Sequence, residues 1–66
     1  MRLYNEMGQQ IKHKGQLNVR DKVRAYPNGR NIYTVLKIAG NIARIKKVRT
    51  GSIYVVMYTK GNGWRW

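Results

Sequence analysis

Turn signals divide the chain from residue 19 onward into short stretches that have the composition of β-strands. Residues 32–38 and 53–58 are rich in β-branched and aromatic side chains, which is typical of strands. Residues 42–48 follow Gly40-Asn41, a pair that tolerates the positive φ angles of a tight hairpin turn. Turns at intervals of roughly 8–12 residues predict a small antiparallel sheet.

Two further stretches complete the predicted sheet. Polar and apolar residues alternate from Asp21 to Ala25 within residues 19–26, and Pro27-Asn28-Gly29 then supplies a turn. At the other end, residues 64–66 can form a short closing strand. A flat sheet of two hairpins is not stable alone at this size. We therefore predict an all-β fold, a small antiparallel barrel of four to five strands over residues 19–66, in which curling hides the sheet edges.

Residues 1–18 form an N-terminal arm whose structure the sequence leaves undecided. Leu3, Met7 and Ile11 have the spacing of residues that line one face of a helix. Gly8 in the middle of this segment disfavours a helix, because glycine is a poor helix former. An extended arm or an irregular strand is equally compatible with these residues, so both alternatives remain open.

The charge balance is the strongest indication of function. Fourteen Lys and Arg residues oppose only Glu6 and Asp21, which gives a net charge of +12. Nine of the cations lie between residues 19 and 50, where Asp21 is the only acidic residue, so this stretch has a net charge of +8. Solubility needs a net charge of only about 2–8 in magnitude, and the surplus repels itself in the folded state. A polyanion is the predicted partner, because binding relieves this repulsion and releases condensed counterions.

Alternation along the strands predicts that several cations share one outward face, where a basic stripe would contact phosphates. The alternative is that they are scattered around the barrel. Aromatic residues interleaved with cations are typical of surfaces that stack bases. In Trp64-Arg65-Trp66 both indoles should point the same way, either capping the barrel or remaining exposed for stacking. The predicted nucleic-acid-binding residues are Arg20, Lys22, Arg24, Arg30, Lys37, Arg44, Lys46, Lys47, Arg49, Tyr26, Trp64, Arg65 and Trp66.

Short motifs within residues 19–59 add a resemblance to a known family. Val19–Ala25 (VRDKVRA), Tyr33–Ile38 (YTVLKI) and the Gly40-Asn41 turn resemble the KOW/Tudor-type small barrels. Members of that family often begin with a Gly-Asp-x-Val-Arg strand, followed by a Tyr-Thr-Val-x-x-Ile strand and a Gly-Asn or Gly-Asp hairpin. Arg20 stands where the family usually has Gly, and the Gly-x-x-Gly loop of KOW domains is not recognisable. The resemblance implies a small β-barrel that binds RNA, DNA, ribosomes, RNA polymerase or peptides.

Residues suited to catalysis are few. His13 and Ser52 are the only histidine and serine, and nothing in the sequence brings them together as in a hydrolase triad. The chain lacks paired carboxylates for Mg²⁺, cysteines for a structural zinc site, and any phosphate-binding loop or dinucleotide motif. We therefore expect no enzymatic activity, no metal and no cofactor.

Two functions follow from these observations. The first is a nucleic-acid-binding module with little sequence specificity, acting on DNA or RNA, because no recognition helix is predicted. The alternative is a protein-interaction module, of a kind that phages or mobile elements encode, that docks on an acidic surface of the transcription, replication or translation machinery. Without a signal-peptide pattern or an apolar stretch of about 20 residues, we expect a cytoplasmic protein that binds no membrane. It should be a monomer, or a homodimer paired through the edge of the strand at residues 53–58.

Overall fold

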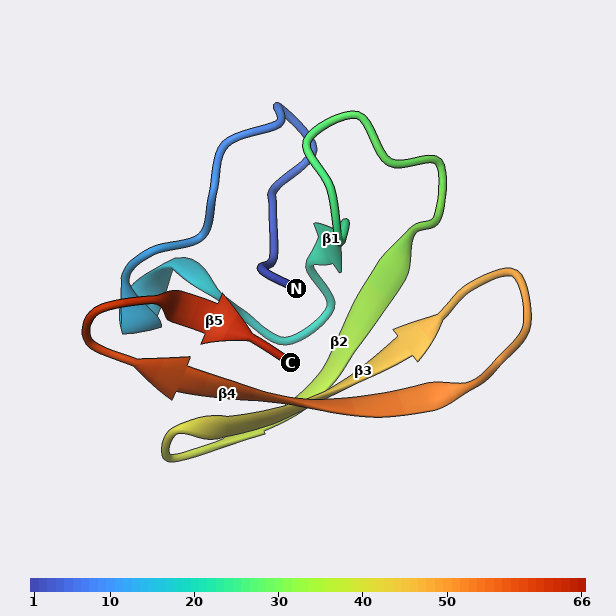
Figure 1. Ribbon diagram of the computed structural model, residues 1–66. Helices are drawn as coiled ribbons and strands as arrows, with labels where there is room; N and C mark the ends of the chain where they lie inside the picture. The colour runs from blue at the N-terminus through green and yellow to red at the C-terminus, as the bar shows by residue number, and fades with distance from the viewer.

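The computed structural model describes residues 1–66 and shows one curled sheet of five antiparallel strands (Figure 1). The only helical element is a 3₁₀ turn, η1 (Lys14–Gln16), and no helix is long and apolar enough to cross a membrane. The predicted all-β fold is confirmed. The strands follow one another in chain order across the sheet and are β1 (Lys22–Val23), β2 (Tyr33–Ala39), β3 (Ile42–Lys47), β4 (Ile53–Thr59) and β5 (Gly63–Arg65).

The first strand is much shorter than the stretch that alternation predicted. β1 contains only two residues, because Arg20 has a φ angle of 78° and breaks the extended backbone just before it. After β1, Arg24 pairs with Tyr4 of the N-terminal arm instead of continuing along β2. The predicted strand over residues 19–26 is therefore reduced to its centre.

The five strands curl into a half-barrel, and the N-terminal arm closes its open side. Tyr4 and Arg24 exchange two backbone hydrogen bonds of 2.8 Å, and the amide of Leu3 donates to the carbonyl of Trp64 at 3.0 Å. These contacts place the start of the chain between the end of β1 and β5, as Figure 1 shows. The helical alternative for the arm is wrong, since this segment is extended apart from turns and η1. The arm is part of the barrel and not a separate unit.

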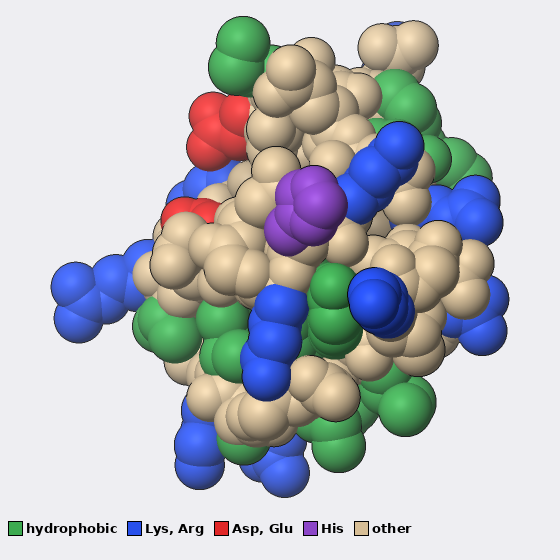
Figure 2. Space-filling model, turned by 90° about the vertical axis from the view of Figure 1, so that its left-hand side faces the viewer, with side chains coloured by type: hydrophobic (Ala, Val, Ile, Leu, Met, Phe, Trp, Pro, Cys, Tyr) green, Lys and Arg blue, Asp and Glu red, His purple; other side chains and the backbone are tan.

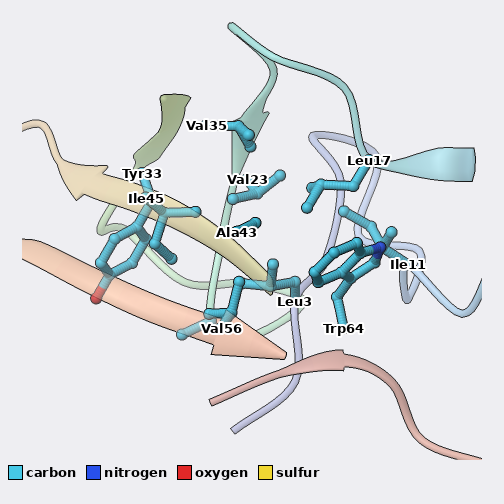
Figure 3. Packing of buried hydrophobic residues seen from close by; sticks show 11 residues of the cluster. Leu3, Ile11, Leu17, Val23, Tyr33, Val35, Ala43, Ile45, Val56 and Trp64 are labelled. Carbon is cyan, nitrogen blue, oxygen red and sulfur yellow. The ribbon is translucent and has the colours of Figure 1, made fainter. Parts of the chain in front are cut away.

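The hydrophobic core lies on the concave side of the sheet (Figure 3). Strict alternation in β3 buries Ala43 and Ile45, and the arm adds side chains that no strand pattern identified. Trp64 is the largest fully buried side chain, and its indole Nε1–H donates to the carbonyl of Lys14 at 3.2 Å. The buried residues contributed by the arm are Leu3, Ile11 and Leu17.

Two irregularities in the strand pairing affect the outer surface. Between β2 and β3 the register shifts after Val35, so that Lys37 and not Leu36 pairs with Arg44. This bulge leaves both Leu36 and Lys37 exposed on the outside. At the other side of the sheet, β5 pairs only with Met57–Thr59, so the first part of β4 has no strand beside it on that edge.

Candidate nucleic-acid interface

In the middle of β3 the pleat separates two apolar side chains from two basic ones. Ala43 and Ile45 are 1% and 0% exposed and face the core, whereas Arg44 and Lys46 alternate with them and are exposed. Successive side chains of a strand point to opposite sides of the sheet, so the two cations must share the outer side. Burial of the apolar pair thus fixes the direction of the basic pair.

Neighbouring strands place two more cations beside them. Lys46 pairs with Thr34 of β2, which in turn pairs with Lys22 of β1. The ammonium group of Lys22 donates a hydrogen bond of 2.9 Å to the Thr34 hydroxyl, which holds it over the sheet. In the next row Lys37 pairs with Arg44. We call this surface the outer basic face, and it consists of Lys22, Lys37, Arg44 and Lys46.

A shallow hollow of about 210 Å³ lies on this face near the hairpin between β2 and β3. Lys37 and Arg44 line it together with the apolar side chains of Ala39 and Ile42. Cations beside an apolar floor can hold a phosphate group while the adjoining sugar packs against carbon. The hollow therefore combines both kinds of side chain on the outer basic face.

No acidic side chain balances the outer basic face from within the sheet. None of the five strands contains Asp or Glu. Of the two acids in the chain, Glu6 belongs to the arm, and Asp21 uses its carboxylate to accept a bond of 3.0 Å from the Asn18 amide. Like charges directly opposite each other, such as Lys37 and Arg44, destabilise a sheet. A bound anion would remove that cost.

Arg20 lies at the margin of this surface in a strained conformation. It is the only residue other than glycine with a positive φ, and its amide donates to the carbonyl of Val35 at 2.8 Å, which sets it beside β2. A left-handed conformation costs a residue with a Cβ atom roughly 1–2 kcal/mol. Glycine would relieve this strain, so the retained cation is a candidate for a functional contact.

The remaining predicted cations do not join the outer basic face. Arg24 is partly buried, its guanidinium donates to the carbonyl of Glu6 at 3.2 Å, and its Nε is buried without a partner. Lys47 pairs with Tyr33 in an inward-facing row and is only half exposed. These two residues therefore fit the alternative prediction, in which the cations are scattered around the barrel. So do Arg30 and Arg49, which are exposed in loops.

The two terminal indoles point the same way, as alternation predicted. Both point inward, so the capping alternative describes them. Trp64 is 0% exposed, so its ring cannot stack on a base in the folded protein. Trp66 is half buried and packs edge-on against Tyr33, with ring centroids 5.4 Å apart. Arg65 points outward beside Met57, beyond β4 and away from the outer basic face.

Tyrosine rings divide in the same way between the core and the surface. Tyr33 packs edge-on against Tyr54 at 5.8 Å, and burial is the main reason why the pKa of Tyr33 is raised, with smaller contributions from Tyr54 and Tyr26. Tyr26 is 59% exposed and shares a surface hollow with Arg30. Among the predicted aromatic contacts, Tyr26 is thus the ring best placed to meet a base.

An exposed apolar row lies directly beside the outer basic face and was not anticipated. It consists of Ile53, Val55 and Met57 on the outer side of β4, which are 59%, 52% and 53% exposed. Lys46 pairs with Ile53 and Arg44 with Val55, so basic and apolar side chains are immediate neighbours. Sequence pattern could not find this row, because β4 is almost entirely apolar on both faces and resembles a strand buried on both sides.

The outer surface of the sheet thus combines a basic half over β1–β3 with an apolar half over β4. No three His, Cys, Asp or Glu side chains come together as a metal would require. Comparison with protein-family models, with curated proteins and with solved structures found no match for the chain.

Proposed function

We propose that the protein is a nucleic-acid-binding module that contacts phosphates through the outer basic face. The observation that carries the proposal is the convergence of four cations on the convex side of a sheet that contains no acidic residue. The net charge of +12 adds a long-range attraction for any polyanion. Sequence preference should be weak, since the contacting groups are flexible cations and no helix is available to enter a major groove.

Stacking plays a smaller part in this proposal than the aromatic content suggested. Trp64 is sealed in the core, and Trp66 is engaged with Tyr33 and Tyr54. Tyr26, beside Arg30, is left to contribute base contacts at one side of the barrel. Affinity should therefore depend mainly on phosphate contacts and hence on salt.

A titration at several salt concentrations tests the proposal. Fluorescence anisotropy with DNA and RNA oligomers, single- and double-stranded, should give a linear fall of log K with log salt. Four phosphate contacts predict a slope of roughly −3.6 on duplex DNA, from about −0.9 per contact. A slope near zero would exclude phosphate contacts as the source of affinity.

The apolar row favours a second candidate function, a protein-interaction module that docks on an acidic protein surface. Exposed aliphatic side chains rimmed by cations are typical of such interfaces, where the charges speed association. A partner captured from nuclease-treated lysate should then be lost when Ile53 and Val55 are changed to Thr. Loss of the partner on nuclease treatment alone would favour the first function.

We also propose an affiliation with the KOW/Tudor-type small barrels. The Tyr33–Ile38 motif lies on β2 and the Gly40-Asn41 pair forms the turn to β3, which supports the resemblance. The binding partners that the resemblance implies include both nucleic acids and proteins, so it is compatible with either candidate function.

A further inference from the structure

A second concentration of cations surrounds a pocket on a different part of the molecule. The pocket has a volume of about 400 Å³ and lies between the N-terminal arm and the turn from β4 to β5. Figure 2 shows this side of the protein, with the histidine among Lys and Arg side chains and the acidic side chains toward one edge. We call it the arm pocket, and its side chains are those of Arg2, Gln10, Lys12, His13 and Lys60, with Gly61 and Gly63 completing the wall.

The arm can form one wall of this pocket only because residue 63 is glycine. Gly63 has a φ of 71°, and a Cβ atom there would lie 2.6 Å from the carbonyl oxygen of Ile11 and 2.7 Å from the Cα atom of Lys12. In addition, the amide of Trp64 donates to the Ile11 carbonyl at 3.2 Å. The backbone of Lys12 is thereby fixed against the start of β5.

Side-chain amides also hold the walls of the pocket in place. The Oε1 atom of Gln16 accepts hydrogen bonds from the amides of Lys12 at 3.0 Å and His13 at 2.9 Å. Across the pocket, the Arg2 guanidinium donates to the Oδ1 atom of Asn62 at 3.4 Å. These bonds shape the pocket without using the ammonium groups of its lysines. The backbone on the arm side of the pocket is therefore fixed before a ligand binds, and the lysine ammonium groups are free to contact it.

The lining has the chemistry of a site for a compact, highly charged anion. It contains no hydrophobic and no acidic side chain, and three of its side chains, those of Arg2, Lys12 and Lys60, are basic. Arg2 also pairs directly with Arg65 across the ladder, so like charges are held together there. A dianion offsets such crowding better than a monoanion, and guanidinium and ammonium groups together suit phosphate oxygens.

We propose that the arm pocket binds a phosphate monoester, whose terminal oxygens contact Arg2, Lys12 and Lys60. The monoester carries nearly two negative charges at neutral pH, whereas a phosphodiester of a nucleic-acid backbone carries one. It can belong to a small phosphorylated metabolite or to the 5′-terminal phosphate of a nucleic acid. The proposal does not rest on the outer basic face, because no residue of that face lines the pocket.

The test is an amide NMR titration with adenosine 5′-monophosphate at constant ionic strength, with adenosine and dimethyl phosphate as controls. The monophosphate should give saturable shifts centred on the amides of residues 10–13 and 60–63. Dimethyl phosphate, a diester, should bind markedly more weakly, and adenosine should not bind there. Equal shifts with the monophosphate and the diester, or shifts spread evenly over all basic residues, would overturn the proposal.

Matched variants separate the pocket from the general charge. Arg2→Gln and Lys60→Gln, both at exposed positions, should each weaken monophosphate binding about tenfold, the effect of one charge-assisted hydrogen bond. Arg44→Gln and Lys46→Gln remove the same charge from the outer basic face and should leave this affinity nearly unchanged. Circular dichroism of each variant verifies that the fold is retained. An equal loss in all four variants would show nonspecific attraction and defeat the proposal.

A comparison of oligonucleotides identifies the source of the phosphate. Tighter binding of a 5′-phosphorylated oligomer than of its 5′-hydroxyl form, with the difference lost in Arg2→Gln, supports a nucleic-acid end as the ligand. Equal binding of the two oligomers, with monophosphate binding intact, supports the pocket as a site for small phosphate esters. Neither result depends on whether Arg44 and Lys46 bind nucleic acid, so each proposal can fail alone.

Discussion

The outer sides of β3 and β4 are neighbours in one sheet and face the same solvent, yet their chemistry is opposite. β3 presents Arg44 and Lys46, whereas β4 presents Val55 and Ile53 directly across from them. On the inner side both strands pack against the core, although β4 adds partly buried tyrosine rings to its one buried valine. The core therefore determines only one face of each strand, and the difference between the outer faces must be explained by what they contact.

Stability measurements on adjacent valines should reveal the largest contrast. Val56 is 0% exposed and Val55 is 52% exposed, although they are consecutive in β4. Val56→Ala should lower the free energy of unfolding by about 2–3 kcal/mol, because it leaves a cavity in a thin core. Val55→Ala should cost only about 0.5 kcal/mol. Urea unfolding measures both, and a comparable loss for Val55→Ala would mean that the outer side of β4 is covered in solution.

Removing charge from β3 should weaken nucleic-acid binding without lowering stability. The double variant Arg44→Gln, Lys46→Gln should bind duplex DNA at least about tenfold more weakly, with a salt slope shallower by about 1.8. The matched variant on β4, Ile53→Thr with Val55→Thr, should retain the slope, since it removes no charge. Anisotropy titrations at several salt concentrations provide both slopes. If the β4 variant lost as much affinity as the β3 variant, the division into a basic and an apolar half would be wrong.

Replacing Arg20 by glycine, at the margin of the basic half, should lower the affinity for nucleic acid without changing the stability of the fold. Because the φ of 78° suits glycine, the relief of about 1 kcal/mol should roughly balance the added entropy of the unfolded chain. Thermal unfolding should therefore show little change. Affinity for nucleic acid should fall severalfold, and an unchanged affinity would assign Arg20 no role in binding.

Alkaline pH should give the smallest effect, and only on the inner side of the sheet. Burial raises the pKa of Tyr33 above its usual value of 10.0, so the folded state retains the proton more strongly than the unfolded state. Its contribution to stability is complete below about pH 10 and is lost as the pH rises through the folded pKa. Unfolding free energies measured from pH 8 to 11 should fall less steeply for Tyr33→Phe than for the natural protein. Parallel curves would contradict this assignment.

Local pattern was sufficient for the sheet and insufficient for the arm. The strands of the three central stretches coincide with runs of β-branched residues bounded by glycine turns, and alternation correctly placed Arg44 and Lys46 outside. The arm contributes Leu3 and Ile11 to the core through contacts with Trp64, some 50 residues away along the chain. Contacts between residues so far apart leave no periodic pattern in the local sequence.

The same limit applies to the candidate sites. Arg24 carries the charge of a surface residue but is partly buried because the arm covers it. Trp64 is buried because the arm packs against it. The arm pocket combines residues from both ends of the chain, Arg2 and Lys60 among them. Its position depends on how the barrel closes, which only the three-dimensional structure describes.

The short pairing of β5 has a consequence for how copies of the protein meet. The uncovered part of β4, from Ile53 to Val56, carries no charged residue that would discourage another strand from joining it. The mutual repulsion of whole molecules, each bearing +12, opposes such pairing. A polyanion that neutralises this charge also removes that protection. Neutralisation of the charge by nucleic acid should therefore coincide with the growth of larger assemblies. The resulting turbidity should disappear again in excess nucleic acid, as the particles regain a net charge.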